Sequence, residues 1–193
     1  MGLYSTLFAA LTLLAGCASS RVVTEHTNPD YVGKSFKSVM VVAVTTDELV
    51  RRTFEDRMVA LLGKRGIKGI PAYAALGGSR GRIEEAQLRQ AIASSGAEGA
   101  LVTRVTRVDR SSGTMSGATV GIGFYGYWET INLPSQTTTG PSTTVSETRL
   151  FDAKNGALAW TGIVDTPEND NLNAALTQYI NVIFDAMVHD RVL

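Results

Sequence analysis

Ser38-Val39-Met40-Val41-Val42-Ala43-Val44 is the stretch of sequence that decides the fold. It is a continuous apolar run in which most residues are β-branched. A strand that is apolar on both faces suits the centre of a sheet that is covered on both sides. The run therefore predicts a buried central strand.

The residues after this run predict an amphipathic helix. Thr45 and Glu48 have the spacing of a capping box, and Gly66 can end the helix through a left-handed cap. Apolar residues recur between them at helical spacing, at Val50, Phe54, Met58, Leu61 and Leu62. The charged residues of this segment are expected to face solvent: Arg51, Arg52, Glu55, Asp56 and Arg57.

Strands and helices continue to alternate through the first half of the chain. The pattern predicts a short strand over 68–73, a second helix from Ile83 to Gly96 and a strand over 100–108. Two helices that alternate with three strands imply right-handed crossovers and an α/β sheet.

The second half predicts a hairpin and a last helix. Strands are expected over 143–151 and 158–164, with Asn155-Gly156 in the turn between them. The apolar stripe of the last helix is Leu172, Leu176, Tyr179, Ile180, Ile183 and Met187. We therefore predict a single α/β domain over 37–193, with a mixed sheet of about five strands, two crossover helices and a C-terminal helix. A Gly/Ser/Thr-rich insertion occupies 111–146.

The balance of basic and acidic residues bears on whether the protein binds nucleic acid. The chain has 18 basic and 18 acidic residues and a formal net charge of zero. A nucleic-acid-binding domain normally has a basic excess, so no nucleic-acid partner is expected. The single cysteine leaves no intramolecular disulfide to stabilise the domain.

The amino terminus carries a short apolar run, over 3–15, that leads into Leu14-Ala15-Gly16-Cys17. The run is shorter than the ~20 apolar residues that a membrane-spanning helix needs. Small residues at its end are typical of a signal-peptide cleavage site. Together these residues resemble the lipobox of bacterial lipoproteins, whose signal peptide is cut before the cysteine and whose cysteine sulfur carries a diacylglycerol. The resemblance implies a signal peptide over 1–16, a lipidated amino terminus and tether over 17–36, and acyl chains such as palmitate on Cys17.

Two other interpretations of this segment stay open. Met1-Gly2 with Thr6 also fits an N-myristoylation pattern. Alternatively, Cys17 is a small buried residue on an apolar helix. The segment before the apolar run contains no Lys or Arg, which departs from the lipoprotein pattern. In lipoproteins the residue after the cysteine influences sorting, and Ala18 favours the outer membrane.

Several other patterns could indicate a ligand or catalytic site, but for each of them we favour a purely structural role. Gly121 to Gly126 matches G-x-G-x-x-G, but strand and loop residues follow it where a nucleotide site needs a helix. The loop over 77–82 lacks the Gly-Lys-Ser/Thr ending of a phosphate loop. The acidic cluster Asp165, Glu168 and Asp170 suits a helix start. The two imidazoles, His26 and His189, lack the motifs of a catalytic or zinc site. We expect no catalytic residues, cofactor, metal or small-molecule substrate, and hence no enzyme.

A family resemblance rests on the order of elements and on the hairpin. Leu150-Phe151-Asp152-Ala153-Lys154-Asn155-Gly156, followed by Ala159-Trp160, resembles the strand–Asp–turn–Gly–strand–Trp hairpin of the TolB amino-terminal domain. The same domain type occurs in the curli-secretion lipoprotein and in small outer-membrane lipoproteins of unknown function. The likeness covers roughly 37–193. It implies an adaptor or assembly factor and supplies no catalytic residues.

These observations predict a lipid-anchored module of the bacterial cell envelope that supports an envelope complex. It would lie at the outer membrane, face the periplasm, and bind other envelope proteins or itself. Exposed aromatic residues are frequent binding anchors, so the expected partner-binding residues are Phe124, Tyr125, Tyr127 and Trp128. The alternative is that these rings pack on the sheet.

The alternative function is an oligomeric outer-membrane pore or secretion-channel subunit that resembles the curli-secretion lipoprotein. Segments 119–131 and 143–151 are each close to the ~9–11 residues of a membrane strand. Their alternation of apolar and polar residues is poor, because 143–151 contains Glu147 and Arg149.

Overall fold

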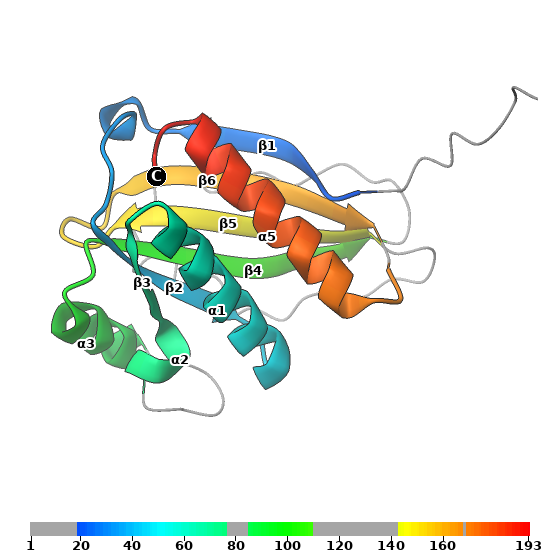
Figure 1. Cartoon of the computed structure of the whole chain (residues 1–193), viewed down its shortest axis with the longest axis horizontal. Coiled ribbons are helices and arrows are strands. Elements are labelled where there is room, and N and C mark those ends of the chain that lie inside the picture. Colours follow the sequence, from blue (N-terminus) through cyan, green and yellow to red (C-terminus); the bar gives the residue numbers. More distant parts are fainter. Residues whose placement is uncertain (1–18, 77–84, 110–142, 168) are drawn as a thin grey trace, which may run out of the picture.

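The computed structural model describes residues 19–76, 85–109, 143–167 and 169–193. These residues form one mixed six-stranded sheet with helices on both faces, which confirms the predicted α/β class (Figure 1). The strands are β1 (Arg21–Thr27), β2 (Ser38–Val44), β3 (Lys68–Pro71), β4 (Gly99–Asp109), β5 (Thr143–Asp152) and β6 (Leu158–Pro167). The helices are η1 (Pro29–Tyr31), α1 (Glu48–Lys64), α2 (Ala72–Ala75), α3 (Glu85–Ser95) and α5 (Leu172–His189).

The sheet has a parallel part and an antiparallel part, in the order β1-β6-β5-β4-β2-β3. β2 is parallel to both β3 and β4, as two crossover connections require. β4, β5, β6 and β1 are joined by antiparallel pairings. The predicted central strand, β2, therefore lies between two parallel neighbours.

The side chains of β2 point alternately to the two faces of the sheet and pack into two hydrophobic cores. Val39, Val41 and Ala43 face α1 and α5, where they meet apolar side chains that include Phe54, Met58, Leu62, Ile180 and Ile183. Met40 and Val42 point to the other face and pack with residues of α2, α3 and β4, among them Ala72, Leu88, Ile92 and Val102. Since successive side chains of a strand point to opposite faces, one apolar run supplies both layers.

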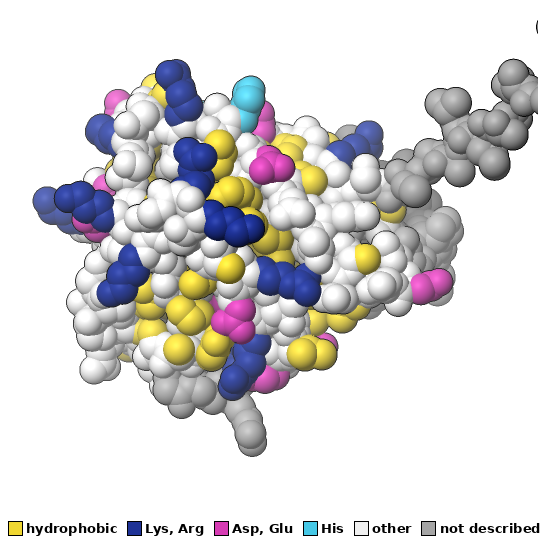
Figure 2. All heavy atoms as spheres, in the orientation of Figure 1, with side chains coloured by type: hydrophobic (Ala, Val, Ile, Leu, Met, Phe, Trp, Pro, Cys, Tyr) yellow, Lys and Arg dark blue, Asp and Glu magenta, His cyan; other side chains and the backbone are white. Residues whose placement is uncertain are grey.

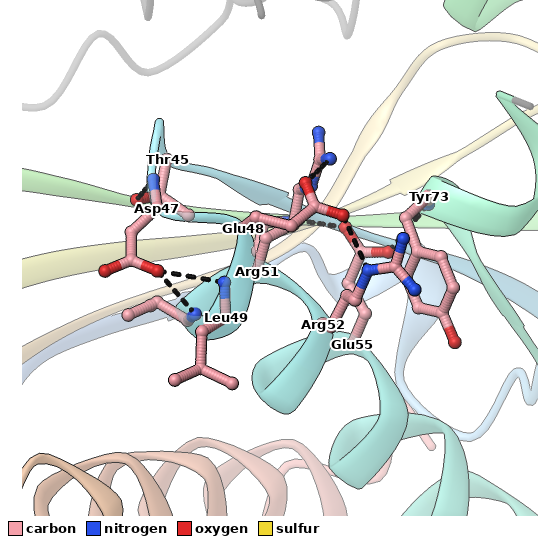
Figure 3. A network of polar contacts seen from close by, with 10 residues as sticks. Thr45, Asp47, Glu48, Leu49, Arg51, Arg52, Glu55 and Tyr73 are labelled. Atoms are coloured by element: carbon pink, nitrogen blue, oxygen red, sulfur yellow. Dashed lines mark hydrogen bonds and ion pairs between the residues drawn. The ribbon is translucent and has the colours of Figure 1, made fainter. Parts of the chain in front are cut away.

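The start of α1 differs from the predicted capping box. Asp47, and not Thr45, is the N-cap residue, because its Oδ1 accepts hydrogen bonds from the backbone N–H groups of Leu49 (2.9 Å) and Val50 (3.1 Å) (Figure 3). Thr45 Oγ1 instead accepts from the Asp47 N–H (3.2 Å) and supports the cap. The predicted end is confirmed, since Gly66 has a φ of +76°.

The prediction of a tether over 17–36 is partly incorrect. Residues 21–27 form β1, which pairs antiparallel with β6, so the sheet has six strands and not five. β1 is an edge strand, with five of its seven residues exposed and Val22 packed on the core, so its sequence carries little apolar signal. Asn28 caps the following η1 turn, and Tyr31 of that turn is buried.

The length and apolarity of the helices bear on how the chain could meet a membrane. Within the described ranges, no helix is long enough and apolar enough to cross one.

Close packing at Gly162 gives a test of this fold. A Cβ at this position would lie 2.2 Å from the ring of Trp160, whose indole is fully buried and donates to Asp190 Oδ2 (2.7 Å). The ring is buried and hydrogen-bonded to Asp190, so it cannot move away from an added methyl group. Gly162→Ala should therefore lower the free energy of unfolding by about 3 kcal/mol. Urea denaturation measures this change.

The matched control is Gly63→Ala on α1, where an added Cβ meets no atom within 4 Å. Alanine in a helix should raise the free energy of unfolding by about 0.5–1 kcal/mol there. Equal stability of Gly162→Ala and the unaltered protein would contradict the packing described for Trp160.

Candidate functional site

The predicted lipidation and partner-binding residues lie outside the described residues. Cys17 belongs to residues 1–18, and Phe124, Tyr125, Tyr127 and Trp128 belong to residues 110–142. The glycine patterns at 77–82 and 121–126 also lie outside. These assignments stay predictions.

The other predicted residues do not come together. Asp165 lies 3.7 Å from Arg21 on β1, and Glu168 lies outside the described residues. His189 is exposed and contacts Asp190, and His26 is an exposed residue of β1. Within the described ranges, no group of three or more His, Cys, Asp or Glu side chains is placed to hold a metal ion.

The structure instead has an apolar groove at the carboxyl ends of β2 and β4. Its volume is about 340 Å³, and it lies between the amino-terminal halves of α1 and α5. In α/β sheets, ligands bind outside the carboxyl ends of the strands where successive crossovers lie on opposite faces. β2 and β4 meet this condition, because α1 and α3 pack against opposite faces of the sheet. The lining is mainly apolar and includes Ala43, Val44, Val50, Phe54, Val105, Leu172 and Leu176.

Thr103 and Tyr179 form the polar floor of the groove, and their hydroxyls contact that of the buried Thr148. The Tyr179 Oη lies 2.5 Å from Thr103 Oγ1 and 2.6 Å from Thr148 Oγ1, and Thr148 Oγ1 donates to Thr103 Oγ1 (2.9 Å). Burial raises the pKa of Tyr179 to about 12, so its hydroxyl stays neutral at physiological pH. The three groups satisfy one another and are held in a fixed orientation. Such a floor suits recognition of an apolar group and places no charge beneath it.

The mouth of the groove exposes apolar side chains. Leu172 and Val105 line the groove and are 52% and 44% exposed. Leu49, at the start of α1, is 72% exposed. Figure 2 shows hydrophobic side chains at the surface beside the amino-terminal end of α1 and along the seam between α1 and α5. Exposed apolar side chains around an apolar groove are typical of a contact surface.

A buried carboxylate lies on the other side of α1, and the sequence did not reveal it. Arg51 and Glu55 were expected to face solvent, but they are 4% and 0% exposed. Glu55 Oε1 accepts from the Ala43 N–H (3.1 Å) and Oε2 accepts from the Tyr73 N–H (2.9 Å), so this side chain joins α1 to the end of β2 and to α2. Helical spacing is the signal that could have revealed it: Glu55 lies three and seven residues before Met58 and Leu62 of the apolar stripe, whereas Asp56 falls on the opposite face of the helix.

Glu48, Arg51 and Arg52, in the first turns of α1, form ion pairs near this carboxylate (Figure 3). Glu48 pairs with Arg51 and with Arg52, and the hydrogen bond from Arg52 holds the pKa of Glu48 below its ordinary value. The Arg52 guanidinium lies over the Tyr73 ring, 4.7 Å from its centroid. These contacts stabilise the first turns of α1 against α2.

A second hollow lies at the opposite end of the sheet. It has a volume of about 530 Å³ and a mixed lining that includes Tyr31, Lys34, Arg89, Glu98, Asp152 and Lys154. The Tyr31 hydroxyl donates to Asp152 Oδ2 (3.0 Å), and burial raises the pKa of Tyr31. This hollow has a mixed lining and lies at the amino ends of β2 and β4. Ligands of α/β sheets bind at the carboxyl ends, so the apolar groove is the better candidate for a site.

Comparison with known proteins gives distant structural similarities. No protein-family model and no curated protein matches the sequence. One similar solved structure is a PelC dodecamer from Paraburkholderia phytofirmans, with 16% identity, 86% of this chain and 95% of that chain covered, and a TM-score of 0.44. Another is lipoprotein GNA1162 from Neisseria meningitidis, with 16% identity, 79% and 98% covered, and a TM-score of 0.43. These names describe the two proteins compared and not this chain.

The buried carboxylate makes the stability of the fold depend on pH. Burial raises the pKa of Glu55 from 4.5 to about 7. The fold therefore favours the protonated form, and this contribution to stability is complete below pH 4.5 and is lost as the pH rises to about 7. Glu55→Gln cannot ionise, so its stability relative to the unaltered protein should rise by about 3 kcal/mol across this interval. Urea denaturation at a series of pH values measures the difference.

Glu25→Gln removes a carboxylate at an exposed position of β1 and is the matched control. The amide introduced by Glu55→Gln also changes the hydrogen bonds to Ala43 and Tyr73, but that effect does not vary with pH. A constant difference between Glu55→Gln and the unaltered protein from pH 4.5 to 7 would contradict the raised pKa.

Proposed function

We propose that this protein is a lipid-anchored interaction module of the bacterial envelope, located at the outer membrane and without catalytic activity. The observation that carries the proposal is the Leu14-Ala15-Gly16-Cys17 segment, which ends immediately before a folded domain. In such a protein the lipid holds the domain at the membrane, and the surface of the domain binds other envelope components.

The structure supports this proposal through the start of the domain. Ser20 is buried, and its hydroxyl donates to Thr166 Oγ1 (3.2 Å). Only Ala18 and Ser19 separate it from Cys17. A chain that begins at Cys17 thus enters the fold almost at once, which suits a lipid attachment point.

The groove supports a role in contact and not in chemistry. Of its lining side chains, Arg104 and Tyr179 are the titratable ones, and Tyr179 stays neutral. General acid–base catalysis needs a group whose pKa lies near the working pH. The groove offers apolar surface and hydroxyls, which are groups that bind.

The expression test uses intact mass and membrane fractionation. In a bacterial host, the unaltered protein should lose residues 1–16, gain acyl mass on Cys17 and sediment with membranes. Cys17→Ala should lose the acyl mass and the membrane association together, because the alanine has no sulfur to carry the lipid. Ser20→Ala, close by, should keep both. An unmodified chain that still carries Met1 would overturn the proposal.

The alternative function, an oligomeric pore, stays a prediction, but one of its two expected membrane strands is wrong. Segment 143–151 was expected to form a membrane strand, but it belongs to β5, which pairs with β4 and β6 inside the domain. The other expected strand, 119–131, lies outside the described residues. The mass of the detergent-solubilised protein by light scattering distinguishes a monomer from a ring of copies.

A further inference from the structure

The topology gathers one set of chain ends at one end of the sheet, which we call the anchor pole. It comprises the start of β1 at Arg21, the carboxyl end of β4, the start of β5, the end of β6 and the amino end of α5. The register shows this directly, since Arg21 pairs with Asp165, and Thr143 pairs with both Asp109 and Pro167. Figure 1 shows the start of β1 and the start of α5 at this end. β2 ends beside Arg104, before the end of β4, and α1 starts close to that point.

The anchor pole is the part of the domain closest to Cys17. Ser20 is fixed to Thr166, and Thr166 lines the apolar groove. From Cys17 to Ser20 the fully extended chain spans at most about 10 Å. A lipid on Cys17 therefore keeps this pole, and not the opposite one, at the membrane surface.

Exposed apolar side chains gather in the same half of the domain. Among the described residues, the large hydrophobic side chains with substantial exposure are Val23, Val32, Leu49, Val105 and Leu172. Four of them lie in the half of the domain that includes the anchor pole, on β1, β4, α1 and α5. Only Val32, next to η1, lies at the opposite pole. Val105 and Leu172 line the same groove, and exposed apolar surface of this kind is typical of a contact site.

The lysines are distributed in the opposite sense. Every lysine of the chain lies at the pole away from Cys17, in segments next to the amino ends of β2, β3 and β4: Lys34, Lys37, Lys64, Lys68 and Lys154. In the half that includes the anchor pole, Arg21 lies near Asp165, and Glu48 is paired with Arg51 and Arg52. Arginine can hold its charged group at a membrane interface while its stem contacts apolar surface.

We propose that the anchor pole rests on the phospholipid bilayer that holds the Cys17 lipid. Val23, Leu49, Val105 and Leu172 lie at the boundary between headgroups and acyl chains, and the apolar groove opens toward the lipid. One acyl anchor alone gives marginal attachment, and a second apolar contact strengthens it. The lysine pole then faces the aqueous phase. This inference rests on the lipidation in the proposed function.

The test places one fluorescent label at either pole of the lipidated protein. The lipid occupies the thiol of Cys17, the only native cysteine, so an introduced cysteine is the only reactive thiol. Val23→Cys and Val32→Cys are a matched pair of exposed valines, 42% and 38% exposed, at opposite poles. Leu172→Cys and Lys154→Cys form a second pair, separated by the ten residues of β6, or about 30 Å.

Each labelled protein is reconstituted into phosphatidylethanolamine and phosphatidylglycerol vesicles, with and without brominated acyl chains. Bromine quenches a fluorophore only at short range. The expected result is a loss of fluorescence for Val23→Cys and Leu172→Cys and none for Val32→Cys and Lys154→Cys.

The outcomes separate this inference from the proposed function. Intact mass is measured on every sample, and absence of acyl mass overturns both. With acyl mass present, equal quenching at the two poles, or quenching only at Val32→Cys and Lys154→Cys, overturns the orientation alone. A label at Leu172→Cys that neither bromolipid nor aqueous iodide quenches shows that protein, such as a second copy, covers the pole, and this also overturns the inference.

Discussion

The burial of β2 on both faces is the constraint on which the rest of the structure depends. Val39, Met40, Val41 and Val42 have no exposed surface, so apolar partners are needed on both sides of the sheet. The chain meets this need by returning twice in parallel, with α1 on one face and α2 and α3 on the other. α5 then completes the first face over the antiparallel strands. A single strand thus determines the layers, the parallel pairing and the edge at which the groove lies.

The polar groups inside this apolar frame are held by defined partners. Tyr179, Thr103 and Thr148 satisfy one another beneath the groove, and Glu55 accepts from two backbone N–H groups. Buried polar groups with fixed partners orient the elements that contribute them, because any other arrangement would leave a donor or acceptor unsatisfied. Here they set the position of α5 over β4 and β5, and of α1 against β2 and α2.

The molecule has two unlike ends, and this polarity connects the fold with the proposed role. One half contains the start of β1, the groove and four exposed apolar side chains, while the lysines lie at the other end. Asp109 and Thr143, the described residues on either side of 110–142, pair with each other at the apolar end. A domain attached through Cys17 would therefore present dissimilar surfaces to the membrane and to the aqueous phase.

The sequence by itself determined the order and type of most elements. Periodicity, the Gly66 cap and the Asn155-Gly156 turn are local signals, so β2, α1, α3, β4, the β5–β6 hairpin and α5 were all predicted near their observed bounds. Only the tertiary structure decided that residues 21–27 complete the sheet, because their partner, β6, lies more than a hundred residues away and β1 has no apolar alternation of its own. The gathering of Val23, Leu49, Val105 and Leu172 in one half of the domain likewise depends on strand order and register. Those are set by contacts between distant segments, which no local pattern of residues encodes.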